Sequence, residues 1–111
     1  MSVFKNTKPV SSIQEFENQL VSQVAEYYSE NYSTLSPPEI KITKGTKFYK
    51  VIVKSSVWGF IARIPFVHKG VQLKKGDLMM AAGWSQAAKH PRGNVIEGTA
   101  MYGPYGPKYL K

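Results

Sequence analysis

Aromatic and cationic residues are interleaved in the last third of the chain, within a segment rich in glycine and proline. Residues 84–94 read Trp-Ser-Gln-Ala-Ala-Lys-His-Pro-Arg-Gly-Asn, and residues 101–110 add three tyrosines beside Gly-Pro pairs. Aromatic rings stack on nucleobases, and Lys and Arg side chains neutralise phosphates. The residue types therefore indicate a polyanionic partner whose bases are free to stack.

Two stretches carry the residues that we expect to bind such a partner. Residues 89–94 combine two permanent cations with a Gly-Asn pair, which suits a turn that aims an Arg fork and backbone N–H groups at one phosphate. The alternative is a surface loop in which Arg92 pairs with a carboxylate such as Glu97. For Trp84, base stacking competes with closure of the core edge, whereas Trp58, inside an apolar run, is expected to pack in the core. The predicted nucleic-acid-binding residues are Lys50, Lys54, Trp84, Lys89, His90, Arg92, Asn94, Tyr102 and Tyr105.

The sequence gives little support for catalysis. The chain has no cysteine and two histidines, and after residue 39 its only acids are Asp77 and Glu97, which fall in different predicted elements. Asp77 follows Lys-Lys-Gly and is typical of a turn. General acid–base chemistry with His90 needs a group that orients the imidazole, and none is identifiable. We therefore predict a non-enzyme with no metal and no cofactor, with a phosphodiester hydrolase using His90 as a weaker alternative.

The net charge of +8 is unevenly distributed along the chain. Residues 1–39 carry two lysines against five glutamates, whereas residues 40–111 carry thirteen Lys and Arg against two acids. A basic body favours a polyanionic partner, although solubility alone also explains surplus lysine. Lys50 and Lys54 would share one face of a continuous strand and line a positive groove, or else form a solvated face.

Nothing in the chain predicts export or contact with a membrane. Residues 1–10 lack the apolar core of a signal peptide. The longest apolar runs, such as residues 57–61 and 78–82, are too short to span a bilayer. The lack of cysteine fits a reducing compartment, so we predict a cytoplasmic protein.

An amphipathic helix is predicted over residues 12–33. Ser12 and Glu15 have the spacing of a capping box, in which each satisfies a free amide of the first turn. Apolar residues then recur at helical spacing, and Pro37-Pro38 forbids continuation. The apolar positions are Ile13, Phe16, Leu20, Val24 and Tyr27 or Tyr28.

After the prolines, strand patterns replace the helical one. Residues 40–42, 49–54, 57–64 and 78–82 have the patterns of strands, with a hairpin turn near Ser55-Ser56. Gly59 inside a strand indicates a bulge or a close approach of other backbone. From Gly83 onward the pattern weakens, although residues 86–89 fit one helical turn.

The predicted fold class is therefore α+β: an N-terminal amphipathic helix packed on a small, mostly antiparallel β-sheet, with an irregular Gly/Pro/aromatic C-terminal segment. We expect a single domain. Its predicted parts are a flexible lead-in at residues 1–11, the helix at 12–33, the sheet at 39–82 and the irregular segment at 83–111.

The second half of the chain resembles a family of small bacteriophage proteins. The resemblance rests on Gly76-Asp77, residues 81–84 (Ala-Ala-Gly-Trp), residues 88–94 (Ala-Lys-His-x-Arg-Gly-Asn), residues 102–104 (Tyr-Gly-Pro) and Tyr109-Leu110. It implies a viral gene product made in the cytoplasm of a bacterial host, and it transfers no catalytic residues. This chain departs from the pattern by inserting roughly residues 65–73.

Two hypotheses follow from these patterns. The leading one is a non-enzymatic, phage-encoded nucleic-acid-binding protein of low sequence specificity that prefers single-stranded DNA. The alternative is an interaction protein, either a modulator of a host enzyme or a virion component. It would use the helix and the aromatic tail as a protein interface. One form of this alternative is a homodimer.

Overall fold

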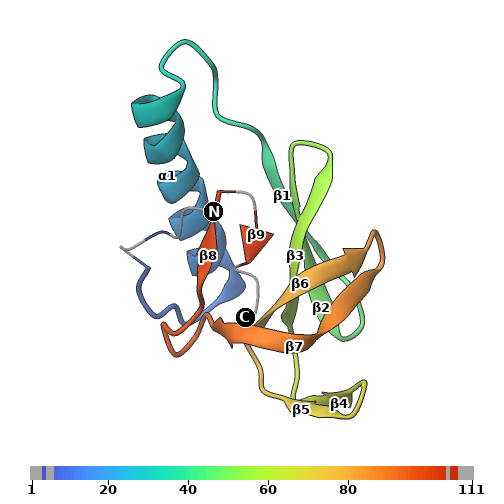
Figure 1. Cartoon of the computed structure of the whole chain (residues 1–111). Helices are drawn as coiled ribbons and strands as arrows, with labels where there is room; N and C mark the ends of the chain where they lie inside the picture. Colours follow the sequence, from blue (N-terminus) through green and yellow to red (C-terminus); the bar gives the residue numbers. More distant parts are fainter. Residues whose placement is uncertain (1–3, 5–6, 105, 108–111) are drawn as a thin grey trace.

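The computed structural model describes residues 4, 7–104 and 106–107 of the chain. One helix, α1 (Ile13–Asn31), packs against a five-stranded antiparallel sheet, so the predicted α+β class is confirmed for the described residues (Figure 1). The sheet has the order β1-β2-β3-β6-β7, formed by β1 (Ile40–Lys44), β2 (Phe48–Val53), β3 (Ser56–Ala62), β6 (Asp77–Gly83) and β7 (Gln86–Asn94). Two small hairpins complete the fold: β4 (Phe66–His68) with β5 (Val71–Leu73), and β8 (Tyr102–Gly103) with β9 (Gly106–Pro107).

Helix α1 begins at the predicted cap. Ser12 Oγ accepts a hydrogen bond from Glu15 N at 3.2 Å, which is one half of the expected capping box. The other half is shifted by one residue, because the Glu15 carboxylate accepts from Ser11 N at 3.0 Å and from Ser11 Oγ at 2.7 Å. These hydrogen bonds, the backbone one first, lower the pKa of the Glu15 carboxyl. At the other end, Tyr32 N donates to Tyr28 O and closes the last turn before the prolines.

The sheet has a hydrophobic core on each face. Side chains alternate between the two faces along a strand, and an irregularity of the β2–β3 register shifts this alternation between Trp58 and Phe60. The inner core lies under α1 and the outer core lies on the opposite face, where the β4–β5 hairpin and β7 cover it. The inner core includes Phe16, Leu20, Val24, Val51, Trp58, Ile61, Leu78 and Tyr102. The outer core includes Phe60, Ala62, Leu73, Met79 and Ala87.

Gly59 marks a bulge, as its position within a strand predicts. The β2–β3 register shifts so that Val51 pairs with Gly59 and Ile52 pairs with Val57, which leaves Trp58 unpaired between them. A Cβ at Gly59 would lie 2.9 Å from Met79 O. Both expected features, the bulge and the close backbone approach, are therefore present at this residue.

Residues 86–94 form strand β7, so the prediction of an irregular segment over residues 83–111 is wrong for this stretch. The helical turn predicted for residues 86–89 is wrong for the same reason. Pro91 and Gly93 make this stretch a poor strand by sequence. However, β7 is an edge strand whose pairing with β6 is interrupted by register shifts. An edge strand tolerates proline because one side of its backbone needs no partner.

The described residues before α1 belong to the fold rather than preceding it. Phe4 N donates to Tyr102 O at 2.9 Å, and Val10 N donates to Val95 O at 3.1 Å. Val10 is only 7% exposed within the inner core. Residues 4 and 7–11 therefore pack against the rest of the fold, and the prediction of a flexible lead-in is wrong for them. The other residues of the predicted lead-in lie outside the described ones. Within the described part of the chain, no helix is long and apolar enough to cross a membrane.

Candidate functional site

Trp84 and Lys50 meet on the outer face of the sheet. Trp84 lies in the tight turn between β6 and β7, and its side chain is 58% exposed. The β6–β7 hairpin lies across the outer face (Figure 1), so the turn reaches the middle of β2. The Lys50 ammonium lies 4.2 Å from the centroid of the Trp84 ring, within the range of a cation–π contact. Val51, the next residue, belongs to the inner core, which directs Lys50 to the opposite face.

An open hollow of about 310 Å³ adjoins this pair. It lies between the β1–β2 turn and Ser85 of the β6–β7 turn. Its lining combines the rings of Phe48 and Phe60 with three lysines and several hydroxyl groups. The lining residues are Thr43, Lys44, Gly45, Thr46, Lys47, Phe48, Lys50, Phe60 and Ser85.

The hollow on the outer face is lined by three lysines, Lys44, Lys47 and Lys50. Residues 40–76 contain nine Lys and Arg and no acid. On the other side of the sheet, α1 carries four glutamates and no Lys or Arg. Of the two acids after residue 76, Asp77 is 4% exposed, and the Glu97 carboxylate forms an ion pair with Lys74 at 2.7 Å. An anion approaching the sheet is therefore favoured on the outer face over the face covered by α1.

Tyr102 is a core residue, which contradicts its predicted role in binding. Its side chain is fully buried, and its ring packs edge-on against Phe16 and Trp58. The Tyr102 hydroxyl donates to Gln23 Oε1 at 2.8 Å, and burial raises the pKa of this phenol. Trp58 packs in the core as predicted and donates from Nε1 to Gly103 O at 3.1 Å. Tyr105 lies outside the described residues.

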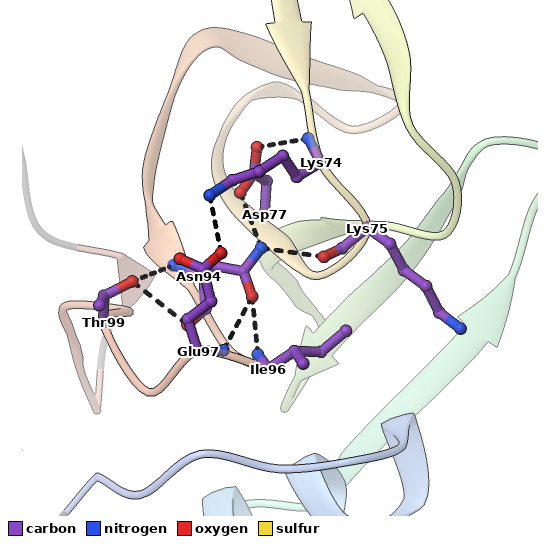
Figure 2. Close-up of polar contacts among 7 residues, drawn as sticks. All are labelled: Lys74, Lys75, Asp77, Asn94, Ile96, Glu97 and Thr99. Carbon is purple, nitrogen blue, oxygen red and sulfur yellow. Dashed lines mark hydrogen bonds and ion pairs between the residues drawn. The ribbon is translucent and has the colours of Figure 1, made fainter.

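Asn94 is buried and structural, so its predicted contact with nucleic acid is also wrong. Figure 2 shows its side chain at the centre of a polar network. Asn94 Nδ2 donates to Asp77 Oδ1 and to Lys75 O, each at 2.9 Å. Asn94 Oδ1 accepts from Ile96 N at 2.8 Å and from Glu97 N at 3.0 Å. Asp77 has the expected turn role, because its Oδ2 accepts from Lys74 N at 2.8 Å.

The other predicted cations are distributed over two regions. Lys89 and His90 are exposed on β7, which is a strand and not the turn that we predicted for residues 89–94. Arg92 is half-buried and donates from its guanidinium to His90 O at 2.6 Å. Lys54 lies in the β2–β3 turn with φ 59°, so it does not continue the strand face of Lys50 as expected.

Of the predicted binding residues, the structure brings Lys50 and Trp84 into contact. It also places beside them residues that the sequence analysis did not select. Lys44, Lys47, Thr46 and Ser85 share the hollow with Lys50. Ser85 reaches the β1–β2 turn only because the β6–β7 hairpin curves over the sheet, and no local pattern carries that information. Lys44 and Lys47 could have been selected from the sequence, because they lie in a run without acidic residues.

Among residues 4, 7–104 and 106–107, no three His, Asp or Glu side chains lie close enough together to hold a metal ion. A scan against protein-family models matches no family, and searches of curated proteins and of solved structures return no match.

Proposed function

We propose that this protein is a non-enzymatic nucleic-acid-binding protein of low sequence specificity that prefers single-stranded DNA. The observation that carries the proposal is the exposed Trp84 ring, held over the Lys50 ammonium at 4.2 Å on the basic face of the sheet. An exposed indole stacks on any unpaired base, because every base has a π-face. In a duplex the bases already stack on one another, so Trp84 favours single strands.

The charge distribution supports the same proposal. The acid-free run of residues 40–76 includes the three lysines that line the hollow, Lys44, Lys47 and Lys50. These cations would neutralise phosphates without selecting bases, in keeping with the low specificity that we propose. Lys89, exposed on β7, is a further cation available to phosphates. The resemblance to small bacteriophage proteins adds the setting that we propose, the cytoplasm of an infected bacterium.

Fluorescence anisotropy with labelled single- and double-stranded oligonucleotides across a salt series tests the proposal. We expect tighter binding to single strands and a steep linear fall of log K with log salt, because bound phosphates release counterions. Trp84→Ala should weaken binding by about 1–3 kcal/mol, the usual contribution of a stacked ring. Trp84→Phe, which keeps a ring, is the matched control. Binding that is indifferent to salt, or equal in wild type and Trp84→Ala, contradicts the proposal.

The protein-docking alternative loses part of its basis. Its aromatic tail includes Tyr102, which is buried against α1 and offers no surface to a partner. A pull-down from host lysate with and without nuclease separates the two functions. Loss of all partners after nuclease treatment supports nucleic-acid binding, and a host protein retained after nuclease supports docking.

A further inference from the structure

We infer that Trp84 and the adjoining hollow form a single nucleotide subsite, with one base on the free face of the indole and a neighbouring phosphate in the hollow. This inference rests on the proposed function and specifies how one unit of the strand is held. It assigns the hollow, which the sequence does not reveal, to phosphate.

The base half of the subsite follows from the exposure of Trp84. One face of the indole is covered by the Lys50 ammonium at 4.2 Å, yet 58% of the side chain is exposed. With Lys50 on one face, we assign the base to the other face of this exposed ring. Lys50 acts here as a positioning residue, because its cation–π contact holds the ring away from the sheet.

The phosphate half follows from the lining of the hollow. Lys44 at the end of β1 and Lys47 in the β1–β2 turn line the hollow, and Lys50 both lines the hollow and contacts the indole. The hydroxyls of Thr46 and Ser85 are hydrogen-bond donors from opposite sides. Because Lys50 belongs to both halves, a phosphate in the hollow lies beside the base that Trp84 stacks.

Arg63 occupies two carbonyl oxygens of the β1–β2 turn that would otherwise repel an anion. Its Nη1 donates to the backbone carbonyls of Gly45 and Thr46, the second at 2.9 Å. Carbonyl oxygens in a turn repel a phosphate, and these two are already engaged by a cation. The guanidinium also adds a positive charge next to the hollow and is itself packed near the ring of Tyr49, 5.6 Å from its centroid.

The two halves make separable predictions for the full-length protein. Of the two tryptophans, Trp58 is buried and Trp84 is exposed, so a ligand-induced change in intrinsic fluorescence reports on Trp84. Oligothymidylate should quench this fluorescence. A labelled abasic oligonucleotide of equal length keeps the phosphates and lacks the bases, so it should bind by anisotropy without quenching.

Two lysine variants of equal charge test the phosphate half. Lys47 lines the hollow, whereas Lys75 lines a separate cavity beside the start of α1. Lys47→Gln should reduce the salt slope for oligothymidylate by about 1, as expected for one lost phosphate contact. Lys75→Gln removes the same net charge and should leave the slope unchanged. Both lysines are exposed, so the variants should fold, as checked by circular dichroism.

The outcomes distinguish the subsite from the proposed function. Equal quenching by the abasic strand, or equal slopes for the two lysine variants, overturns the subsite while the protein still binds oligonucleotides. Absence of binding to every oligonucleotide overturns the proposed function and the subsite with it.

Discussion

The side-chain amide of Asn94 donates a hydrogen bond to Asp77 Oδ1 at 2.9 Å, joining the end of β7 to the start of β6 (Figure 2). The same amide also donates to Lys75 O, and its oxygen accepts from the backbone of the following turn. One buried side chain therefore connects the turn before β6 with the turn after β7, at the end of the β6–β7 hairpin opposite to Trp84. The hairpin that carries Trp84 is held at this end by Asn94.

Replacing Asn94 should destabilise the protein strongly. Asn94→Ala leaves three part-buried backbone groups and Asp77 Oδ1 without this partner, which we expect to cost about 2–4 kcal/mol in the free energy of unfolding. Urea denaturation followed by circular dichroism measures this loss. The control is Asn18→Ala on the exposed side of α1, which should stay within about 0.5 kcal/mol of wild type. Equal stability of the two variants would show that the network contributes little.

Gly59 and Gly83 should respond differently to the same added methyl group. A Cβ at Gly59 meets Met79 O at 2.9 Å and Pro107 Cγ at 3.1 Å, whereas a Cβ at Gly83 meets nothing within 4 Å. Gly59→Ala should therefore cost about 1–3 kcal/mol through overpacking. Gly83→Ala should be nearly neutral. Thermal unfolding compares them, and a midpoint for Gly59→Ala as high as that of Gly83→Ala would contradict the tight approach.

The stability of the protein should depend on Tyr102 at alkaline pH. Burial raises the pKa of this phenol above its ordinary value of 10.0, and hydrogen bonds with Thr7 and Gln23 offset part of the rise. The fold thus favours the protonated form. Its contribution is complete below the unfolded-state pKa and is lost as the pH rises through the folded-state value.

Tyr102→Phe isolates this effect. The variant should be less stable at neutral pH by about 1 kcal/mol, because Gln23 loses a buried hydrogen bond. As the pH is raised above 10.0, wild type should lose the advantage that it holds over the variant. Urea titrations of both proteins over this range measure the difference, and a constant gap would mean that Tyr102 does not titrate differently in the fold.

The helix and the first strands were predictable because their signals are local. The cap at Ser12 and the apolar spacing after it define α1, and the alternation around Val51 defines β2. The role of Tyr102 was not predictable from its neighbours. Its Gly-Pro context fits either a base-stacking platform or a tail packed onto the sheet, and its burial depends on Gln23, which is 79 residues away in the chain.

In the candidate site, too, the residue types follow from local sequence, whereas the contacts depend on residues distant in the chain. Lys50 and Trp84 were each selected as candidate binding residues from residue type and context. Their contact was not, because it depends on the curvature of the β6–β7 hairpin over β2. Asn94 was misassigned because a Gly-Asn pair suits an anion-binding turn and a buried structural turn equally well.

The bond from Tyr102 to Gln23, together with that from Phe4 to Tyr102, ties both ends of the chain to α1. On the ribosome, α1 is synthesised early and acquires these partners only when residues 102–103 have left the exit tunnel. Until then its apolar stripe lacks the ring that completes the inner core. The inner core is therefore incomplete in any chain that stops before Tyr102, and such truncated chains should be cleaved by proteases faster than chains that include it.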